Sequence, residues 1–214
     1  MAHLHITLKL TWRTAFHTTG NRWKWGADKA LTQRYDGQFV LPATSLKGAL
    51  REQAERLMRG HVHICASSDP GQMCPNPDNL CLVCRVFGNP RRPSPLRFQD
   101  VLLPQEEMET QIRAGVAISR RRRAAVPQRL YFVETTAAGS MQAQAVVEGF
   151  FRQEAEEAAA LVVLAARMLP SLGAGRSRGL GWLAAVDAQC TIDGQPLPNA
   201  TLQAYWNQWL GGGQ

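Results

Sequence analysis

The stretch HLHITLKLTW, residues 3–12, alternates polar and apolar side chains without a break. Alternate side chains of a strand point to opposite faces, so this pattern predicts a half-buried strand over residues 3–16. The apolar face must pack on a core. The histidines and threonines of the other face are expected to be solvated. The apolar set is Leu4, Ile6, Leu8, Leu10 and Trp12.

Further along the chain, helix and strand patterns follow one another in a recognisable order. Helices are expected over about 45–59 and 152–169, with Thr44 or Ser45 as the N-cap of the first. The further strands are expected over 96–103, 130–133, 142–149 and 182–192, and a short helix over 202–210. The order strand, helix, strand, strand, helix, strand predicts an α+β, ferredoxin-like βαββαβ core. Proteins with this fold have many different functions, so the fold alone does not indicate the function.

The chain length and composition fit one domain spanning residues 1–214. With 45% hydrophobic and 19% charged residues, the sequence is globular in type and wholesale disorder is excluded. No apolar run is long enough for a membrane-spanning helix, and no secretory signal is visible at the start. We therefore expect a cytoplasmic protein without a membrane partner.

The charge balance is basic, with 24 Lys and Arg against 17 Asp and Glu and a net charge of +7. Most of the cations are arginine, whose planar guanidinium fits phosphate and stacks on bases. This balance favours a nucleic-acid partner, although a merely basic protein remains an alternative.

Four cysteines lie within twenty residues, and two of them form the C-x-x-C motif Cys81–Cys84. The surrounding segment is rich in turn residues and cannot build a core, so a structural zinc ion bound by four thiolates would fold it. His61 and His63 are possible substitute ligands. The alternatives are four free or buried thiols, or a redox C-x-x-C. Cys190 stands apart and is expected to be a small buried residue. The proposed ligands are Cys65, Cys74, Cys81 and Cys84.

Three segments have the composition of phosphate-binding sites. The helix that begins at Ser45 carries Lys47 and Arg51 one turn apart, close to its positive N-terminal end. The loop 173–181 combines glycines with arginines, which suits the close approach of a phosphate chain. A run of four arginines without acidic partners indicates a protruding arm or, alternatively, a merely solvated charge run. The loop residues singled out are Gly173, Gly175, Arg176, Arg178 and Gly179, and the run is Arg120, Arg121, Arg122 and Arg123.

Residues 17–41 lack periodicity, and a loop of this length is typically functional or disordered. Asp28 lies in it and taken alone would be a turn former. Trp23 and Trp25 precede it, and tryptophans more often belong to the core than to base-stacking platforms. His17 is an isolated candidate for acid–base chemistry.

Five motifs together, in this order, resemble the RAMP superfamily of CRISPR proteins, and within it the repeated backbone subunit of type III effector complexes. The resemblance extends over about residues 4–192. The motifs are Leu41–Arg51 (LPATSLKGALR), Phe87-Gly88, Ser94–Asp100 (SPLRFQD), Gly115–Arg120 (GVAISR) and Leu172–Gly181 (LGAGRSRGLG).

The resemblance implies an RNA-recognition-motif-like core whose copies stack head to tail along a CRISPR RNA, beside other effector subunits. Ser45, Lys47, Arg51 and the loop 173–181 would hold RNA phosphates. The arm at about 113–131 would be a thumb hairpin that wedges between bases of the guide–target duplex. Segment 61–88 would be a zinc-binding insertion.

In members of this family that cleave target RNA, an Asp in the loop before the Ser-Leu-Lys-Gly motif is needed for a metal-dependent reaction, for which Mg²⁺ is the expected ion. Asp28 fits that position, with Asp36 as a second candidate. Three interpretations stay open: an RNA-guided endoribonuclease subunit, a non-catalytic scaffold with the same partners, and an unrelated zinc-containing RNA-binding module or stand-alone processing nuclease.

Overall fold

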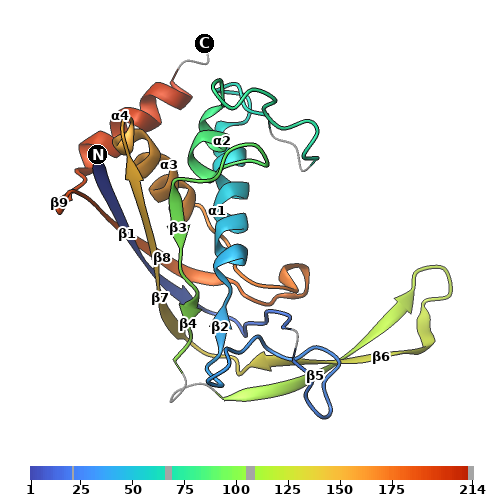
Figure 1. The fold of residues 1–214 in the computed structure, drawn as a ribbon. Coiled ribbons are helices and arrows are strands. Elements are labelled where there is room, and N and C mark those ends of the chain that lie inside the picture. The colour runs from blue at the N-terminus through green and yellow to red at the C-terminus, as the bar shows by residue number, and fades with distance from the viewer. Residues whose placement is uncertain (21, 66–68, 105–108, 212–214) are drawn as a thin grey trace.

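The strand predicted at the start of the chain lies inside a five-stranded antiparallel sheet (Figure 1). The computed structural model describes residues 1–20, 22–65, 69–104 and 109–211. The strand is β1 (Ala2–Trp12), and all five of its predicted apolar side chains are fully buried. The sheet order is β3-β7-β1-β8-β9, with β3 over Leu96–Phe98, β7 over Met141–Phe151, β8 over Leu183–Ile192 and β9 over Gln195–Pro196.

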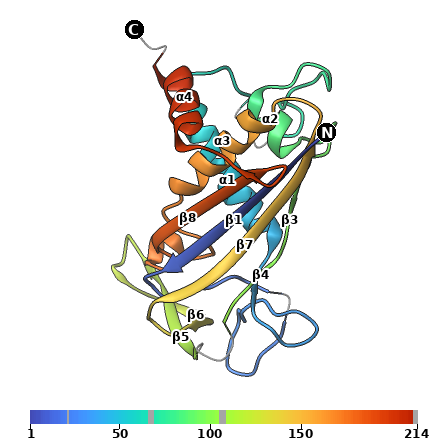
Figure 2. The same cartoon turned by 90° about the vertical axis from the view of Figure 1, so that its left-hand side faces the viewer.

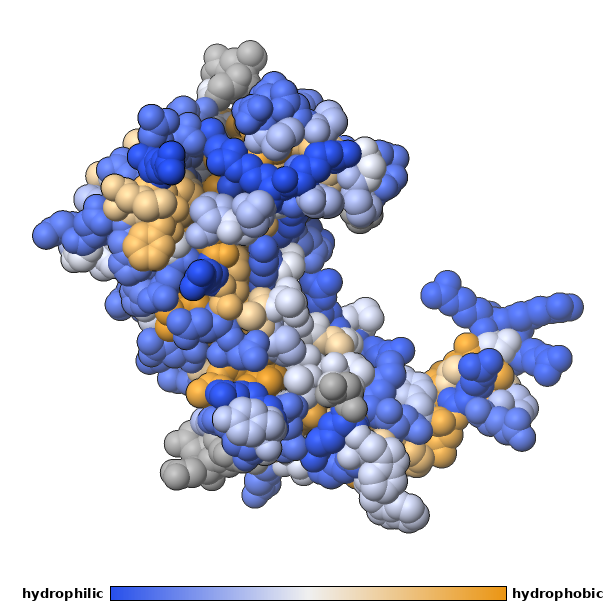
Figure 3. All heavy atoms as spheres, in the orientation of Figure 1, coloured by the Kyte–Doolittle hydropathy of each residue, from blue (hydrophilic) through white to orange (hydrophobic). Residues whose placement is uncertain are grey.

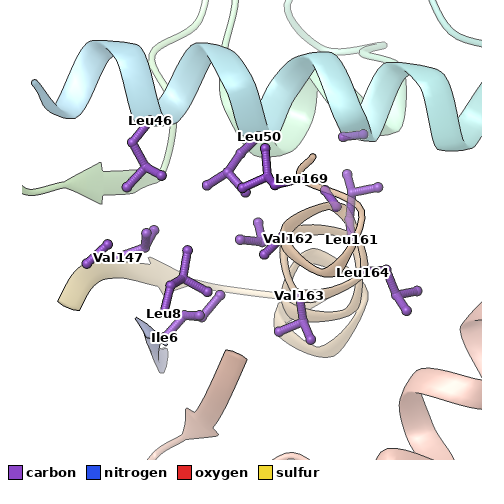
Figure 4. Packing of buried hydrophobic residues seen from close by; sticks show 14 of the residues in the cluster. Ile6, Leu8, Leu46, Leu50, Val147, Leu161, Val162, Val163, Leu164 and Leu169 are labelled. Carbon is purple, nitrogen blue, oxygen red and sulfur yellow. The ribbon is translucent and has the colours of Figure 1, made fainter. Parts of the chain in front are cut away.

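Two helices cover the apolar face of this sheet (Figures 1 and 2). They are α1 (Ala43–Met58) and α3 (Ala155–Arg167), which follow the first and third strands of the core. Taken in chain order, the core strands β1, β3, β7 and β8 lie in the order β3-β7-β1-β8 across the sheet. The βαββαβ prediction is therefore confirmed. Figure 4 shows Leu46 and Leu50 of α1 pointing toward α3 and the sheet, where Ile6, Leu8 and Val147 lie.

The start of α1 differs from the prediction. The helix begins at Ala43 after Pro42, and neither Thr44 nor Ser45 caps it. The carboxylate of Asp100 accepts the Ala43 N–H at 2.7 Å from 57 residues away. The strand predicted over 96–103 is split at Gln99 and Asp100 into β3 and β4 (Val101–Leu102), and β4 pairs with β2 (Val40–Leu41).

A long hairpin projects away from the sheet (Figure 1). It consists of β5 (Thr110–Ser119) and β6 (Ala124–Thr136), so the strand predicted at 130–133 and the predicted arm belong to one element. The remaining elements are short: α2 (Leu82–Phe87), the 3₁₀ turn η1 (Arg176–Arg178) and α4 (Asn199–Leu210). In the part of the chain that the structure describes, no helix combines the length and apolar character needed to cross a membrane.

Candidate functional site

The N-terminal turn of α1 and the glycine loop, two of the predicted phosphate-binding segments, line one open groove. Its volume is about 390 Å³, and Ser45 and Gly48 face Gly173 and Arg176 across it. The glycine loop is tied to the segment that follows β1, where the Ala174 N–H donates to His17 O at 2.7 Å. Gly173 has φ +99°, and a Cβ there would lie 2.5 Å from the same carbonyl oxygen, so no other residue fits.

Lys47 and Arg51 share a face of α1, as their spacing predicts, but it is not the face that carries Ser45. They line a separate hollow of about 540 Å³ with Gly88 and Asn89. The Lys47 ammonium lies 5.8 Å from the centre of the Phe98 ring. Burial, and then the neighbouring Arg51 charge, lower the pKa of Lys47.

The Arg51 guanidinium is engaged by protein groups. It donates to Glu55 Oε1 at 2.8 Å, to Gly88 O at 2.7 Å and to Cys84 Sγ at 3.6 Å. These hydrogen bonds fasten the cysteine-rich segment to α1. Of the two predicted cations, Lys47 is the one for which the described residues provide no hydrogen-bond acceptor.

The four-arginine run forms the turn between β5 and β6, at the far end of the hairpin, where all four side chains are exposed. Ser119 shapes this turn: its Oγ accepts the Arg122 N–H at 3.2 Å, and its carbonyl accepts the Arg123 N–H at 2.7 Å. Figure 3 shows hydrophilic side chains at the tip and hydrophobic ones along the shaft. The exposed apolar residues of the shaft are Ile112, Val116, Ile118, Leu130 and Phe132.

The glycine loop also touches the hairpin. The Arg178 guanidinium lies over the Tyr131 ring, 5.3 Å from its centre. That ring crosses Gly115 of the partner strand so closely that a Cβ at Gly115 would lie 2.3 Å from a ring carbon. The groove and the hairpin are thus joined through one cation–π interaction.

Asp28 lies at the base of the hairpin and is exposed. Its Oδ2 accepts the Phe132 N–H at 2.6 Å, and its own N–H donates to Phe132 O at 2.9 Å. Among the described residues Asp28 belongs to no group of three or more His, Cys, Asp or Glu side chains that could hold a metal ion. Asp36 lies in a separate turn, where it accepts the Gln38 N–H at 3.1 Å.

Glu134, which sequence analysis did not single out, fixes the loop that carries Asp28. Its carboxylate is fully buried and accepts from Arg22 at 2.9 Å, from the Leu31 N–H at 3.0 Å and from Lys24. Desolvation alone would raise the pKa of Glu134, but Lys24, the Leu31 N–H and Arg22 together hold it below its usual value. No local motif marks this residue, because its partners are more than 100 residues away in the chain.

His17 belongs to the same network. Its buried ring bonds Glu134 O through Nδ1 at 2.7 Å and Thr19 Oγ1 through Nε2 at 3.0 Å. A carbonyl oxygen only accepts, so Nδ1 carries the proton. Burial lowers the pKa of His17, which keeps the ring neutral. The suggestion of acid–base chemistry at His17 finds no support, because both ring nitrogens already bond protein groups.

The expectation that Trp23 and Trp25 belong to the core is wrong. They are 77% and 83% exposed. Arg22 and Lys24 turn inward to Glu134, so the tryptophans that alternate with them turn outward.

The four clustered cysteines come together as predicted, with all four sulfurs within 4.8 Å of one another. Cys65 Sγ lies 3.2 Å from Cys84 Sγ and 3.7 Å from Cys81 Sγ. Four sulfurs at the usual Zn–S distance of about 2.3 Å in a tetrahedron are about 3.8 Å apart, so the set fits one metal ion such as zinc. His61 and His63 are not part of the cluster.

Burial and the neighbouring sulfurs shift the pKa values of the clustered thiols. Burial raises the pKa of Cys74 and Cys84, and their sulfur neighbours add to the effect. Holding all four as thiolates therefore needs a cation between them. Cys190 is buried in β8, as expected, and desolvation raises its pKa to about 11.

The fold and these sites define an α+β protein of the ferredoxin-like plan, with a basic hairpin and a four-cysteine insertion. The family model of the RAMP superfamily matches residues 14–184. The chain therefore belongs to the RAMP superfamily, which associates it with CRISPR, with CRISPR RNA and with effector complexes. A search of the curated proteins finds no match to this chain.

Proposed function

We propose that this chain is a CRISPR RNA-binding backbone subunit of a type III effector complex. The observation that carries the proposal is the groove in which Ser45 and the α1 N-terminal turn face Gly173 and Arg176. The N-terminal turn of a helix, a glycine loop and an arginine together suit a phosphate chain. Arg176 also bonds Glu52 at 3.2 Å, which holds it at the rim.

The β5–β6 hairpin is the thumb in this proposal. Its apolar shaft inserts between bases of the guide–target duplex, and its arginine tip binds the RNA backbone. The cation–π interaction between Arg178 and Tyr131 keeps the thumb in register with the guide groove. Copies of the chain stack head to tail along the guide, so successive thumbs meet the duplex at regular intervals, beside other effector subunits.

Asp28 is the proposed catalytic residue for cleavage of target RNA. It is exposed at the base of the thumb, and among the described residues its Oδ1 has no partner. A lone carboxylate does not make a two-metal clamp. It suits one divalent ion, such as Mg²⁺, or orients a 2′-hydroxyl on a backbone that the thumb has already distorted toward in-line geometry.

The four cysteines bind structural zinc in this proposal. A site closed by four thiolates has no open position for chemistry. Its function is to fold segment 61–88, which the bonds from Arg51 to Cys84 and Gly88 fasten to α1.

The test is cleavage of guide-complementary RNA by the assembled complex with Mg²⁺, using wild type, Asp28→Ala and Asp36→Ala. Regularly spaced products that vanish only in Asp28→Ala support the proposal. Products that persist in Asp28→Ala and vanish in Asp36→Ala move catalysis to Asp36.

A non-catalytic scaffold is the second candidate function. It is favoured by the hydrogen bond that already occupies Asp28 Oδ2, and by the absence of Asp28 from any group of three or more possible metal ligands among the described residues. Target binding by the wild-type complex without any product would establish it. Membership of the RAMP superfamily argues against an unrelated zinc-containing module. Several copies per guide would distinguish a backbone subunit from a stand-alone processing nuclease.

A further inference from the structure

Two tryptophans stand out of the loop 22–31 into solvent. Trp23 and Trp25 are 77% and 83% exposed, whereas Trp12 and Trp209 are 0% and 5% exposed. Their ring centroids are 6.2 Å apart and their planes meet at 69°, an edge-to-face pair. This geometry leaves ring faces free for another aromatic group.

The structure enforces this exposure. Arg22 and Lys24 alternate with the two tryptophans, and both point inward to the fully buried carboxylate of Glu134. Successive side chains of an extended segment point to opposite sides, so two inward cations place Trp23 and Trp25 outward. A buried anion thus holds two large apolar side chains in water, which favours a binding role for them over a packing role.

The pair is also fixed in place beside the hairpin. Trp25 and Gly26 form a turn closed by the Ala27 N–H, which donates to Lys24 O at 3.1 Å. Gly26 has φ +76°, and a Cβ there would lie 3.5 Å from Ile112 of β5. Asp28 follows two residues later and pairs with Phe132 of β6. The tryptophans and Asp28 are therefore carried by one short rigid segment at the hairpin base.

We propose that Trp23 and Trp25 form a stacking site for an unpaired base of the target RNA. Aromatic faces stack on any base, which suits a complex that must accept every target sequence. Arg22 and Lys24, each with one-third of its side chain exposed, outnumber the single Glu134 carboxylate that they bond, which leaves positive charge in the segment beneath the rings. The site rests on the proposed function. The position of Asp28 indicates that the stacked base belongs to the target RNA and not to the guide RNA. A base held here lies next to the proposed cleaving residue, whereas the guide lies in the groove of Ser45 and Gly173.

The test uses the assembled complex in an Asp28→Asn background, so that the target stays intact and the hydrogen bond from Phe132 is kept. A target RNA carries the fluorescent base 2-aminopurine at the nucleotide beside each thumb. We expect quenching that is lost in Trp23→Ala/Trp25→Ala and kept in the double Phe variant. Target affinity should fall about tenfold in the double Ala variant. Tyr35→Ala is the matched control, since Tyr35 is 95% exposed within the longer loop 17–41 and should change neither readout.

Several outcomes would overturn the proposal that Trp23 and Trp25 stack on a target base. One is unchanged quenching and unchanged target affinity in the double Ala variant. Trp-dependent quenching of 2-aminopurine in the guide, and not in the target, would assign the pair to the guide. Defective assembly of the double Ala variant before target is added would assign it to a protein interface. Trp-dependent quenching in a complex whose wild type makes no products supports the stacking site and contradicts the proposed cleavage, so the two failures are distinguishable.

Discussion

Asp28 and Phe132 exchange two hydrogen bonds, although 104 residues separate them. Phe132 N–H donates to Asp28 Oδ2 at 2.6 Å, and Asp28 N–H donates to Phe132 O at 2.9 Å. The loop therefore pairs with β6 along the edge of the hairpin. The parallel bridge between Lys29 and Val133 extends this pairing. Any displacement of the hairpin by bound RNA must move the Asp28 carboxylate with it.

The first prediction separates the structural and chemical functions of Asp28. Asp28→Asn keeps an oxygen that can accept the Phe132 N–H, so its stability should match wild type. Asp28→Ala removes that hydrogen bond, and we expect a cost of about 1 kcal/mol at this exposed position. Both variants should lose cleavage of target RNA. Thermal unfolding and product assays on the same preparations check this, and Asp28→Asn with full activity would contradict a carboxylate mechanism.

The second prediction concerns the buried carboxylate of Glu134. Glu134→Gln should destabilise the protein at neutral pH by about 3 kcal/mol. This value is at the low end of the destabilisation caused by removing one partner of a buried ion pair. We expect the low end because both cations keep one-third of their side chains exposed.

The stability difference between wild type and Glu134→Gln depends on pH, and the sign of this dependence follows from the pKa of Glu134. The folded pKa of Glu134 lies below its ordinary value of 4.5. Its stabilisation is therefore present above about pH 4.5 and is lost as the pH falls through the lower folded pKa. Unfolding of wild type and Glu134→Gln from pH 7 to pH 3 should show curves that converge in acid. Glu148→Gln, at a carboxylate 40% exposed, is the control and should show little difference at any pH.

The fold was predictable because its signals are local. Alternation in β1 and the helical spacing of Leu46, Leu50, Ala54 and Leu57 follow from burial of one face, and the βαββαβ order follows from them. The cysteine cluster was predictable because ligand spacing in the chain is itself informative.

The site was only partly predictable because its determinants are not local. Glu134 bonds Arg22, Lys24 and Leu31 across more than 100 residues, and nothing near it in sequence marks it. The same bonds reversed the expectation for Trp23 and Trp25. Asp100 capped α1 from 57 residues away, which made the local N-cap prediction wrong.

The third prediction concerns the cysteine cluster. The purified protein should contain one zinc ion per chain, and Cys81→Ser should lose it, whereas Cys190→Ser should keep it. Chelation should make segment 61–88 sensitive to protease, because metal binding supplies the folding free energy of such segments. Elemental analysis and limited proteolysis test this. One ion per chain in Cys81→Ser would contradict four-thiolate binding.

The fourth prediction concerns the arginines at the hairpin tip. Replacing Arg121 and Arg122 with Ala should weaken RNA binding and flatten its salt dependence, because fewer RNA phosphates are then neutralised by the protein. The log–log slope should fall by about 0.7 for each single-strand phosphate that is no longer neutralised. Affinity measured over a series of salt concentrations gives the slope.

Arg59→Ala is the control for the tip variant, since Arg59 is exposed at the end of α1, away from the hairpin. Its slope should match that of wild type. Equal slopes in the tip variant and wild type would show that the tip does not touch phosphate.

The last prediction compares two glycines of one loop that both have positive φ and differ in surroundings. Gly173 and Gly179 have φ +99° and +83°, so alanine at either position should cost about 1 kcal/mol or more in backbone strain. Only at Gly173 does the new Cβ also meet the His17 carbonyl, at 2.5 Å, while the space at Gly179 is open. Gly173→Ala should therefore move the loop away from His17, widen the groove beside Ser45 and weaken guide binding more than Gly179→Ala. Thermal unfolding and guide affinity of the two variants give the comparison. Equal loss of guide affinity would mean that loop flexibility matters and that the close approach at His17 does not shape the groove.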